Sequence, residues 1–195
     1  TGGGRLTTFN ISTAAAFVAA GAGVRIAKHG NRSFSSRSGS ADILEALGVR
    51  IELAPERMAE VLETAGIVFM FAPLLHPAMK HVAPVRRELR MPTVMNVLGP
   101  LTNPAGARRQ VVGVADPALI PLIAEALQQL GHLRALVVHG EPGIDELSPI
   151  GATTLVELRD GRLAGSTIDL RDHLHGHDLD PASLAGGDPA DNARL

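Results

Sequence analysis

The sequence predicts an α/β protein in which a mainly parallel sheet is covered by helices and a β-hairpin follows near the end of the chain. Three observations lead to this class. Short apolar runs rich in β-branched residues alternate with helical patterns, which is typical of βαβ units. One run, residues 67–71, is apolar at every position, as expected for a strand buried on both faces. Asp160-Gly161 separates two strand-like runs and is a favoured hairpin turn.

In the first half of the chain, glycine and proline mark the element boundaries. Gly48 stops one helical pattern, Pro55 opens the next and Gly66 closes it, while a further helical pattern continues through Pro84. The expected elements are, in order, an alanine-rich helix with Ser12 or Thr13 as N-cap, a strand at 24–27, a helix at 41–47, an extended piece at 50–53, a helix at 55–65, a strand at 67–71 and a helix at 77–89.

In the second half, turn formers predict a loop over residues 96–107, which contains Gly99-Pro100 and Asn103-Pro104. The expected elements after it are a strand at 111–114, a helix at 117–130, a strand at 135–138 and hairpin strands at 154–158 and 162–168. We expect loop beyond Asp172. No repeat or linker divides the chain, so a single domain over residues 1–195 is expected, and the start at Thr1 within a glycine loop indicates an excerpt of a longer protein.

Composition excludes several classes of protein. The formal net charge is −2, whereas nucleic-acid-binding and anionic-membrane-binding proteins usually carry a basic excess, so we expect neither partner. The longest apolar run, residues 14–20, is too short to span a bilayer. The absence of cysteine excludes disulfides and thiolate metal sites and is typical of a cytoplasmic enzyme.

Three small-residue stretches near the start of the chain are typical of phosphate binding. They are residues 1–4 (Thr-Gly-Gly-Gly), residues 10–13 (Asn-Ile-Ser-Thr) and residues 28–32 (Lys-His-Gly-Asn-Arg), the last leading into a serine-rich stretch that ends at Asp42. Glycine lets backbone N–H groups approach an anion, hydroxyl groups add donors, and a helix start favours negative charge. The third stretch follows a predicted strand, at the edge where open α/β sheets bind ligands.

Other charged groups suggest further chemistry. Asp145 and Glu146 follow a predicted buried strand, and paired hard oxygen ligands on a loop suit Mg²⁺ that bridges substrate phosphates. An ordinary acidic loop is the alternative for this pair. Arg86 and Arg87 fit a solvated helix face, or an arginine that clamps a carboxylate. The alternating histidines near the end are expected to be exposed and without a metal; they are His173, His175 and His177.

Taken together, these motifs resemble the anthranilate phosphoribosyltransferases, a family of tryptophan biosynthesis. The matching segments are, in order, residues 1–3, 10–13, 28–32, 38–42, 76–80 (His-Pro-Ala-Met-Lys), 96–104 (Asn-Val-Leu-Gly-Pro-Leu-Thr-Asn-Pro) and 143–146 (Gly-Ile-Asp-Glu). The resemblance implies the α/β domain of the nucleoside-phosphorylase-type phosphoribosyltransferases, without the family's N-terminal helical domain. It also implies a Mg²⁺-dependent homodimer that transfers phosphoribosyl from phosphoribosyl pyrophosphate (PRPP) to anthranilate.

The same resemblance implies the binding residues. Substrate contacts would come from Gly2, Gly3, Thr8, Asn10, Ser12, Thr13, Lys28, His29, Gly30, Asn31, Ser36, Ser40 and Arg86. Among these, His29, Asn31 and Arg86 would face anthranilate, with Arg86 on its carboxylate. Ser12, Asp145 and Glu146 would serve Mg²⁺. No residue would act as nucleophile or strong base, because positioning and electrostatics suffice.

The chain departs from the family at the glycine loop, where Gly4-Arg5 stands in place of Asp-Gly. The replaced carboxylate helps to hold PRPP, so a catalytically inactive chain is one alternative. A second alternative is a non-catalytic relative that binds nucleic acid, and a third is a pyrimidine nucleoside phosphorylase. The charge and the Asp145-Glu146 pair argue against the second, and the motifs at 28–32 and 96–104 argue against the third.

Overall fold

The computed structural model describes residues 6, 8–33, 37–89, 93–173 and 179–195, and it confirms the α/β class. The internal contacts group these residues into two compact units. The parallel-pair unit holds residues 9–95 and 186–195, and the mixed-sheet unit holds residues 96–185 with residues 6 and 8. The single domain expected over residues 1–195 stays a prediction.

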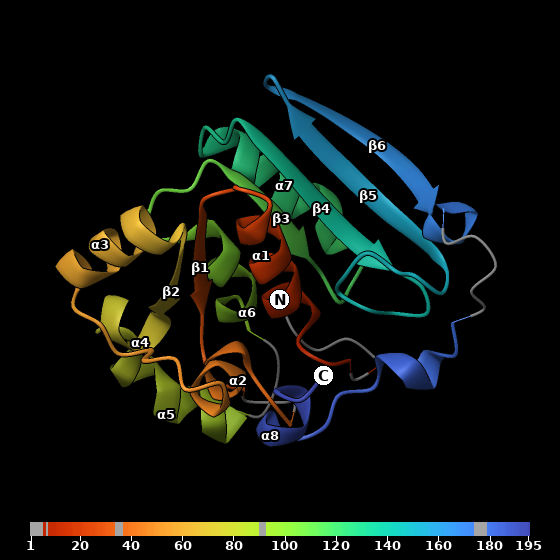
Figure 1. Ribbon diagram of the computed structural model, residues 1–195. Coiled ribbons are helices and arrows are strands. Elements are labelled where there is room, and N and C mark those ends of the chain that lie inside the picture. Colours follow the sequence, from red (N-terminus) through yellow and green to blue (C-terminus); the bar gives the residue numbers. More distant parts are fainter. Residues whose placement is uncertain (1–5, 7, 34–36, 90–92, 174–178) are drawn as a thin grey trace. The chain divides into compact units, whose positions relative to one another are not determined.

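The parallel-pair unit is built on two strands, β1 (Ile26–Gly30) and β2 (Ile67–Phe71), which pair in parallel and lie side by side in Figure 1. Their register sets Lys28 opposite Phe69 and Gly30 opposite Phe71, so both strands end at the same edge. The helices of this unit are α1 (Ile11–Gly21), α2 (Ser40–Ala46), α3 (Pro55–Ala65), α4 (Ala72–Leu75), α5 (Met79–Leu89) and α8 (Pro189–Asn192), and α6 (Met95–Leu98) begins at its last residue.

Strand β2 is buried on both faces, as its apolar sequence predicts. Phe69 and Phe71 pack with residues of α2 and with Ile51, while Val68 and Met70 pack with Met58 of α3. Successive side chains of a strand point to opposite faces, so this alternation divides one apolar run between two core clusters. The strand therefore forms the centre of this unit.

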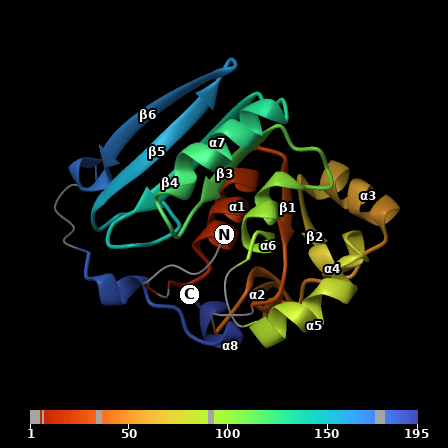
Figure 2. The same cartoon turned by 180° about the vertical axis from the view of Figure 1, so that it is seen from behind.

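The mixed-sheet unit contains four strands in the order β3 (Arg109–Gly113), β4 (Arg134–Gly140), β5 (Ala152–Arg159) and β6 (Arg162–Asp169). The β3–β4 pair is parallel, whereas β4–β5 and β5–β6 are antiparallel. Helix α7 (Leu119–Gln129) lies across this sheet (Figure 2) and buries its apolar stripe against β3, β4 and β5. Short 3-10 helices complete the unit: η1 (Gly99–Leu101), η2 (Leu170–His173) and η3 (Pro181–Leu184).

Several boundaries differ from the sequence-based expectation. Strand β1 begins at Ile26 rather than residue 24, because the chain first turns at Gly23, which has a φ of 88° and leaves Val24 exposed. The strand then continues through Lys28 and His29, which were expected on a loop. Residues 50–53 form no strand in the described part of the chain, and the expected loop at 96–107 begins with α6 and η1.

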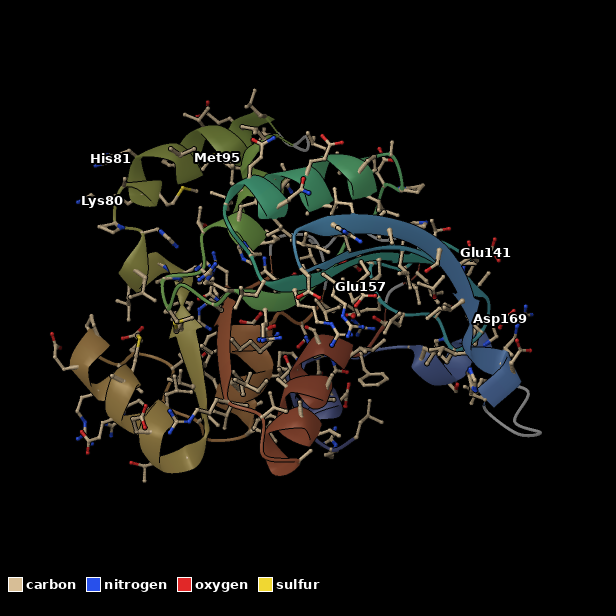
Figure 3. All side chains as sticks on the ribbon, turned by 90° about the horizontal axis from the view of Figure 1, so that it is seen from above. Lys80, His81, Met95, Glu141, Glu157 and Asp169 are labelled. Carbon is tan, nitrogen blue, oxygen red and sulfur yellow. The ribbon has the colours of Figure 1, made fainter. Side chains whose placement is uncertain are left out.

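Two acidic side chains of the mixed sheet are held in ion pairs on its surface (Figure 3). Glu157 of β5 accepts from Arg134 Nη2 at 2.9 Å, and Asp169 of β6 pairs with Arg171. The hydrogen bond from Arg171 lowers the pKa of Asp169 to about 2. Both carboxylates are therefore engaged by arginine. In the described residues no helix combines the length and apolar character that crossing a bilayer requires.

The hairpin turn between β5 and β6 yields a test of the fold. Asp160 and Gly161 both have positive φ, 50° and 73°, as this turn requires. Gly161→Ala is expected to lower the free energy of unfolding by about 1–2 kcal/mol, because alanine is strained in the left-handed region. Urea denaturation measures the change. The control is Gly165→Ala on β6, where an added Cβ meets nothing within 4 Å; equal losses for both variants would contradict the turn assignment.

Candidate functional site

The hydroxyl, amine and amide groups predicted to bind phosphate gather at the carboxyl end of β1. Lys28 Nζ donates to Ser12 Oγ at 3.1 Å, and Thr13 Oγ1 donates to Ser40 Oγ at 3.3 Å. The first contact joins β1 to the first turn of α1, and the second joins α1 to the start of α2. Residues of two of the three sequence stretches therefore meet in the parallel-pair unit: Ser12 and Thr13 of the second, and Lys28 and Ser40 of the third.

The N-cap prediction for α1 is wrong. The N-cap is Asn10, with φ −74° and ψ 64° and no side-chain capping bond, while Ser12 and Thr13 lie inside the first turn. Thr13 is 2% exposed and its hydroxyl donates to Ser40, so this side chain makes a tertiary contact in place of a local cap. Ser12 is exposed, and its N–H has no acceptor within the described part of the chain. The first turn thus presents a backbone donor and a hydroxyl to solvent.

Asn10 acts as a cross-link instead of a cap. Its Nδ2 donates to the Ser38 carbonyl at 3.0 Å, and its Oδ1 accepts from Ser38 Oγ at 3.2 Å. Asn192 of α8 donates to the same Oδ1 at 2.9 Å. One amide therefore joins three segments that are remote in sequence, and it fixes the start of α1 against the approach to α2.

Glycines permit the tight packing around this cluster. A Cβ at Gly30 would lie 2.8 Å from the Phe69 ring and 3.5 Å from Ser40 Cβ. At Gly39 the added atom would lie 2.4 Å from the Ser33 amide nitrogen. Real Cβ contacts are not as short as 2.8 Å or 2.4 Å, so a side chain at Gly30 requires the Phe69 ring to shift and one at Gly39 requires the backbone to move. The proximity at Gly30 is to an aromatic side chain, and a substrate contact there stays a prediction.

His29 has a partner that the sequence did not identify as a site residue. Its Nε2 lies 3.1 Å from Nε2 of His76, and the two rings meet edge to face with centroids 5.0 Å apart. One ring nitrogen must donate and the other accept, so at least one of these two nitrogens carries no proton in this arrangement. His76 follows α4, which follows β2, and it reaches the edge at which β1 ends. The position of His76 soon after a buried strand is the sequence feature that could have identified it as a site residue.

The remaining predicted residues fall into two groups. Thr8 forms an isolated antiparallel bridge with Ala185, and His173 is exposed in η2. The side chain of Arg86 on α5 lies outside the described residues. Also outside them are Gly2, Gly3, Gly4, Arg5, Ser36, His175 and His177. Their predicted roles stay predictions.

The acidic pair lies in the mixed-sheet unit, after β4. The chain turns through Pro142 and through Gly143, which has a φ of 117°, and Ile144 returns to form hydrogen bonds of 2.8 and 2.9 Å with Gly140. Ile144 is 1% exposed, and the side chains of Asp145 and Glu146 are half-buried. Burial of Ile144 thus anchors the turn and holds the two acids next to the strand end.

Two glycines at strand ends receive the backbone of this acidic pair. A Cβ on Gly113, the last residue of β3, would lie 1.5 Å from the Asp145 carbonyl oxygen. A Cβ on Gly140, the last residue of β4, would lie 2.6 Å from the Glu146 carbonyl oxygen. The acids therefore sit against the carboxyl ends of two parallel strands. Sequence reasoning missed both glycines as contributors to the site.

The donor chemistry of the pair suits a hard cation but does not complete a metal site. Mg²⁺ usually binds to one or two carboxylates and takes its other oxygens from water and substrate phosphates. Among the described residues, no three His, Asp or Glu side chains lie close enough together to hold a metal ion. Two adjacent half-buried carboxylates match that pattern. The assignment of Ser12, Asp145 and Glu146 as metal ligands stays a prediction.

Comparison with known proteins gives consistent matches over the whole chain. The family model described as "Glycosyl transferase family, a/b domain" matches residues 1–195. The anthranilate phosphoribosyltransferase of Rubrobacter xylanophilus is 57% identical over 196 residues, which cover 100% of this chain and 57% of that protein. The enzyme of the same name from Syntrophobacter fumaroxidans is 54% identical and is covered to 58%.

Solved structures show the same similarity. Anthranilate phosphoribosyltransferase from Thermus thermophilus superposes with a TM-score of 0.89 at 49% identity, over 99% of this chain and 56% of that one. The Saccharomyces cerevisiae protein, in complex with PRPP and Mg, superposes with a TM-score of 0.88 at 32% identity, over 97% and 52%. The chain thus spans a little over half the length of the relatives that it matches.

The close approach at Gly113 generates a prediction. Gly113→Ala is expected to lower the free energy of unfolding by about 3 kcal/mol or more, because the new methyl group overlaps a backbone carbonyl rather than a flexible side chain. Urea denaturation measures the loss, with Gly165→Ala as the matched control. A Gly113→Ala protein as stable as this control would show that the acidic turn does not depend on close contact with β3.

Proposed function

This chain belongs to the glycosyl transferase family through its a/b domain, and we propose that it performs the phosphoribosyl transfer of an anthranilate phosphoribosyltransferase. In this reaction the phosphoribosyl group of PRPP moves to the amino nitrogen of anthranilate, and pyrophosphate leaves. The relatives that carry this name are 51–57% identical to the whole chain. The observation that carries the proposal is the Ser12, Thr13, Lys28 and Ser40 cluster at the carboxyl end of β1.

PRPP is the proposed ligand of this cluster. An ammonium group, three helix-start hydroxyls and the N–H of Ser12 form a set of hydrogen-bond donors. Such donors bind phosphate oxygens, and Lys28 acts as a point charge. The similar Saccharomyces cerevisiae protein has been solved with PRPP and Mg. We therefore assign the phosphates to Asn10, Ser12, Thr13, Lys28, Asn31 and Ser40, with Gly2, Gly3, Thr8 and Ser36 as further contacts.

Mg²⁺ is the proposed cofactor, with Asp145, Glu146 and Ser12 as its protein contacts. The half-buried carboxylates supply hard oxygen atoms, which is the chemistry that Mg²⁺ prefers. When bound, the ion neutralises charge on the pyrophosphate. Lys28 adds a fixed positive charge near the phosphates, and the hydrogen bond with Ser12 orients its ammonium group before the substrate binds.

The transfer needs no nucleophilic side chain of the protein. As the bond between the anomeric carbon and pyrophosphate breaks, positive charge builds on the sugar and negative charge on the leaving group. The amine of anthranilate is neutral at pH 7, so positioning it against the sugar suffices for attack. We propose that His29 and Asn31 contact anthranilate and that Arg86 binds its carboxylate with paired hydrogen bonds.

The alternatives receive less support. A nucleic-acid-binding relative would need a basic surface, whereas the net charge is −2. Against a pyrimidine nucleoside phosphorylase stand the relatives at 51–57% identity, which are named anthranilate phosphoribosyltransferases. A chain with weakened PRPP binding is the third alternative, because Gly4 stands in place of the family's aspartate. We further propose a homodimer in the cytoplasm, as the sequence resemblance implies.

The acidic pair generates a metal-dependence prediction. Asp145→Asn and Glu146→Gln should each remove the gain in PRPP affinity that Mg²⁺ provides, because they abolish a charged ligand without changing side-chain shape. Calorimetric titration of PRPP with and without Mg²⁺ measures the gain. Asp160→Asn, at an exposed turn of the same unit, is the control and should keep it. A full Mg²⁺ effect in both site variants would refute the metal assignment.

Arg86 provides a test of the anthranilate assignment. Arg86→Ala should raise the KM for anthranilate by about tenfold or more, because a charge-assisted pair is lost. Steady-state kinetics at saturating PRPP measures it. Lys80→Ala, which changes an exposed residue of the same helix (Figure 3), should leave KM unchanged. A KM that is the same in the Arg86 variant and the unsubstituted protein removes this role.

A further inference from the structure

Arg32 has no role in the proposed reaction, yet its guanidinium group contacts two carboxylates and an aromatic ring. Its Nη1 donates to Asp42 Oδ1 at 3.2 Å and also contacts Glu45, and its Nη2 donates to Glu45 Oε1 at 2.9 Å. Both acids belong to α2, one turn apart. A residue that directly follows Asn31 is thus fixed to the helix that begins with Ser40.

The guanidinium group also contacts the core. Its Cζ lies 5.5 Å from the ring centroid of Phe71, the last residue of β2, which is 6% exposed. A guanidinium over an aromatic face is attracted by the ring quadrupole. Arg32 therefore joins α2 to the end of β2 as well as to its own loop.

Asp42 extends these contacts to both sides of the loop base. Its Oδ2 accepts from the Gly39 amide at 2.8 Å and from the Ser33 amide at 3.1 Å, while its Oδ1 accepts from Arg32. The Ala41 amide donates to the Asn31 carbonyl at 3.3 Å. We call residues 31–33 and 39–42 the loop neck. Its two sides are held together by one carboxylate, one arginine and a close approach at Gly39.

The charges of the neck persist across neutral pH. Burial alone would raise the pKa of Asp42, but the amide bonds from Gly39 and Ser33 and the contact with Arg32 outweigh it and hold that pKa below its usual value. The hydrogen bond from Arg32 likewise lowers the pKa of Glu45. Both carboxylates are therefore ionised at neutral pH, where the ion pairs with Arg32 are present.

We propose that Arg32 is a positioning residue for PRPP, which closes the loop neck and thereby holds Asn31 and Ser40 in place before the ligand binds. The inference rests on the proposed function. Ser40 is itself bonded to Thr13, so a neck that opens would disturb two proposed phosphate contacts together. Ordering these groups in advance removes an entropic cost from binding.

Positioning and direct phosphate binding by Arg32 predict opposite effects at Glu45. If Arg32 bound phosphate itself, Glu45→Gln would free its guanidinium group and remove a negative charge, so PRPP would bind at least as tightly. If Arg32 acts by closing the loop neck, the same change removes an ion pair that holds Arg32 in place, and PRPP binding becomes weaker. Glu45→Gln is therefore the decisive variant, and Arg32→Gln accompanies it.

The chain offers a matched control. Arg25 forms a two-pronged pair with Glu63, at 2.9 and 2.7 Å, and it precedes β1 at the end opposite the site. Both members of that pair are more than half exposed. Arg25→Gln and Glu63→Gln thus remove an arginine–glutamate pair from the same unit without touching the loop neck.

Calorimetric titration of PRPP in the presence of Mg²⁺ tests the proposal. Arg32→Gln and Glu45→Gln should each weaken PRPP binding by about three- to tenfold. The double variant should bind PRPP no more weakly than Arg32→Gln alone. The two control variants should change affinity less than about twofold. In turnover assays, the KM for PRPP should rise while kcat stays unchanged. Urea denaturation shows whether each variant is folded. If Arg32→Gln does not fold, Glu45→Gln alone tests the proposal.

Two results would overturn the inference alone: PRPP binding by Glu45→Gln that equals or exceeds that of the unsubstituted protein, or equal weakening by Arg25→Gln. Failure of the unsubstituted protein to bind PRPP would overturn the proposed function and this inference with it.

Discussion

Close packing at the carboxyl ends of strands is the constraint on which both groups of candidate residues depend. At Gly113 and Gly140 the ends of β3 and β4 leave room only for hydrogen, so the backbone of the acidic pair can pass directly over them. At the end of β1, an added Cβ on Gly30 would instead meet the side-chain ring of Phe69, at 2.8 Å. Glycine at these positions lets side chains from separate loops be fixed close to a rigid strand.

Polar side chains then lock the loops of the parallel-pair unit. Asn10 joins α1, the segment before α2 and α8, while Lys28 and Thr13 join the strand end and α2 to the first turn of α1. Each bond is modest by itself, at about 1 kcal/mol. Their value lies in geometry, because they orient donors before a ligand arrives and so lower the cost of ordering them on binding. An enzyme that works by positioning and charge requires this kind of order.

Sequence patterns predicted the features that local chemistry decides. The αL closure of α3 at Gly66, the two-sided burial of β2 and the turn at Asp160-Gly161 all follow from signals within a few residues. The contacts of the site join residues far apart in the chain. Asn10 and Asn192 are 182 positions apart, and His29 and His76 are 47 apart. A hydroxyl expected to cap its own helix, on Thr13, instead bonds to Ser40, because folding brings a better partner within reach.

The central proposal is that the donor cluster at the end of β1 binds PRPP. Nuclear magnetic resonance titration with PRPP tests it directly, because a bound ligand shifts the signals of nearby backbone amides. The amides of Ser12, Thr13 and Ser40 should shift until the protein is saturated, whereas the amide of Arg25, before the opposite end of β1, should not. Unchanged signals of Ser12, Thr13 and Ser40 at high PRPP concentration would contradict the proposal.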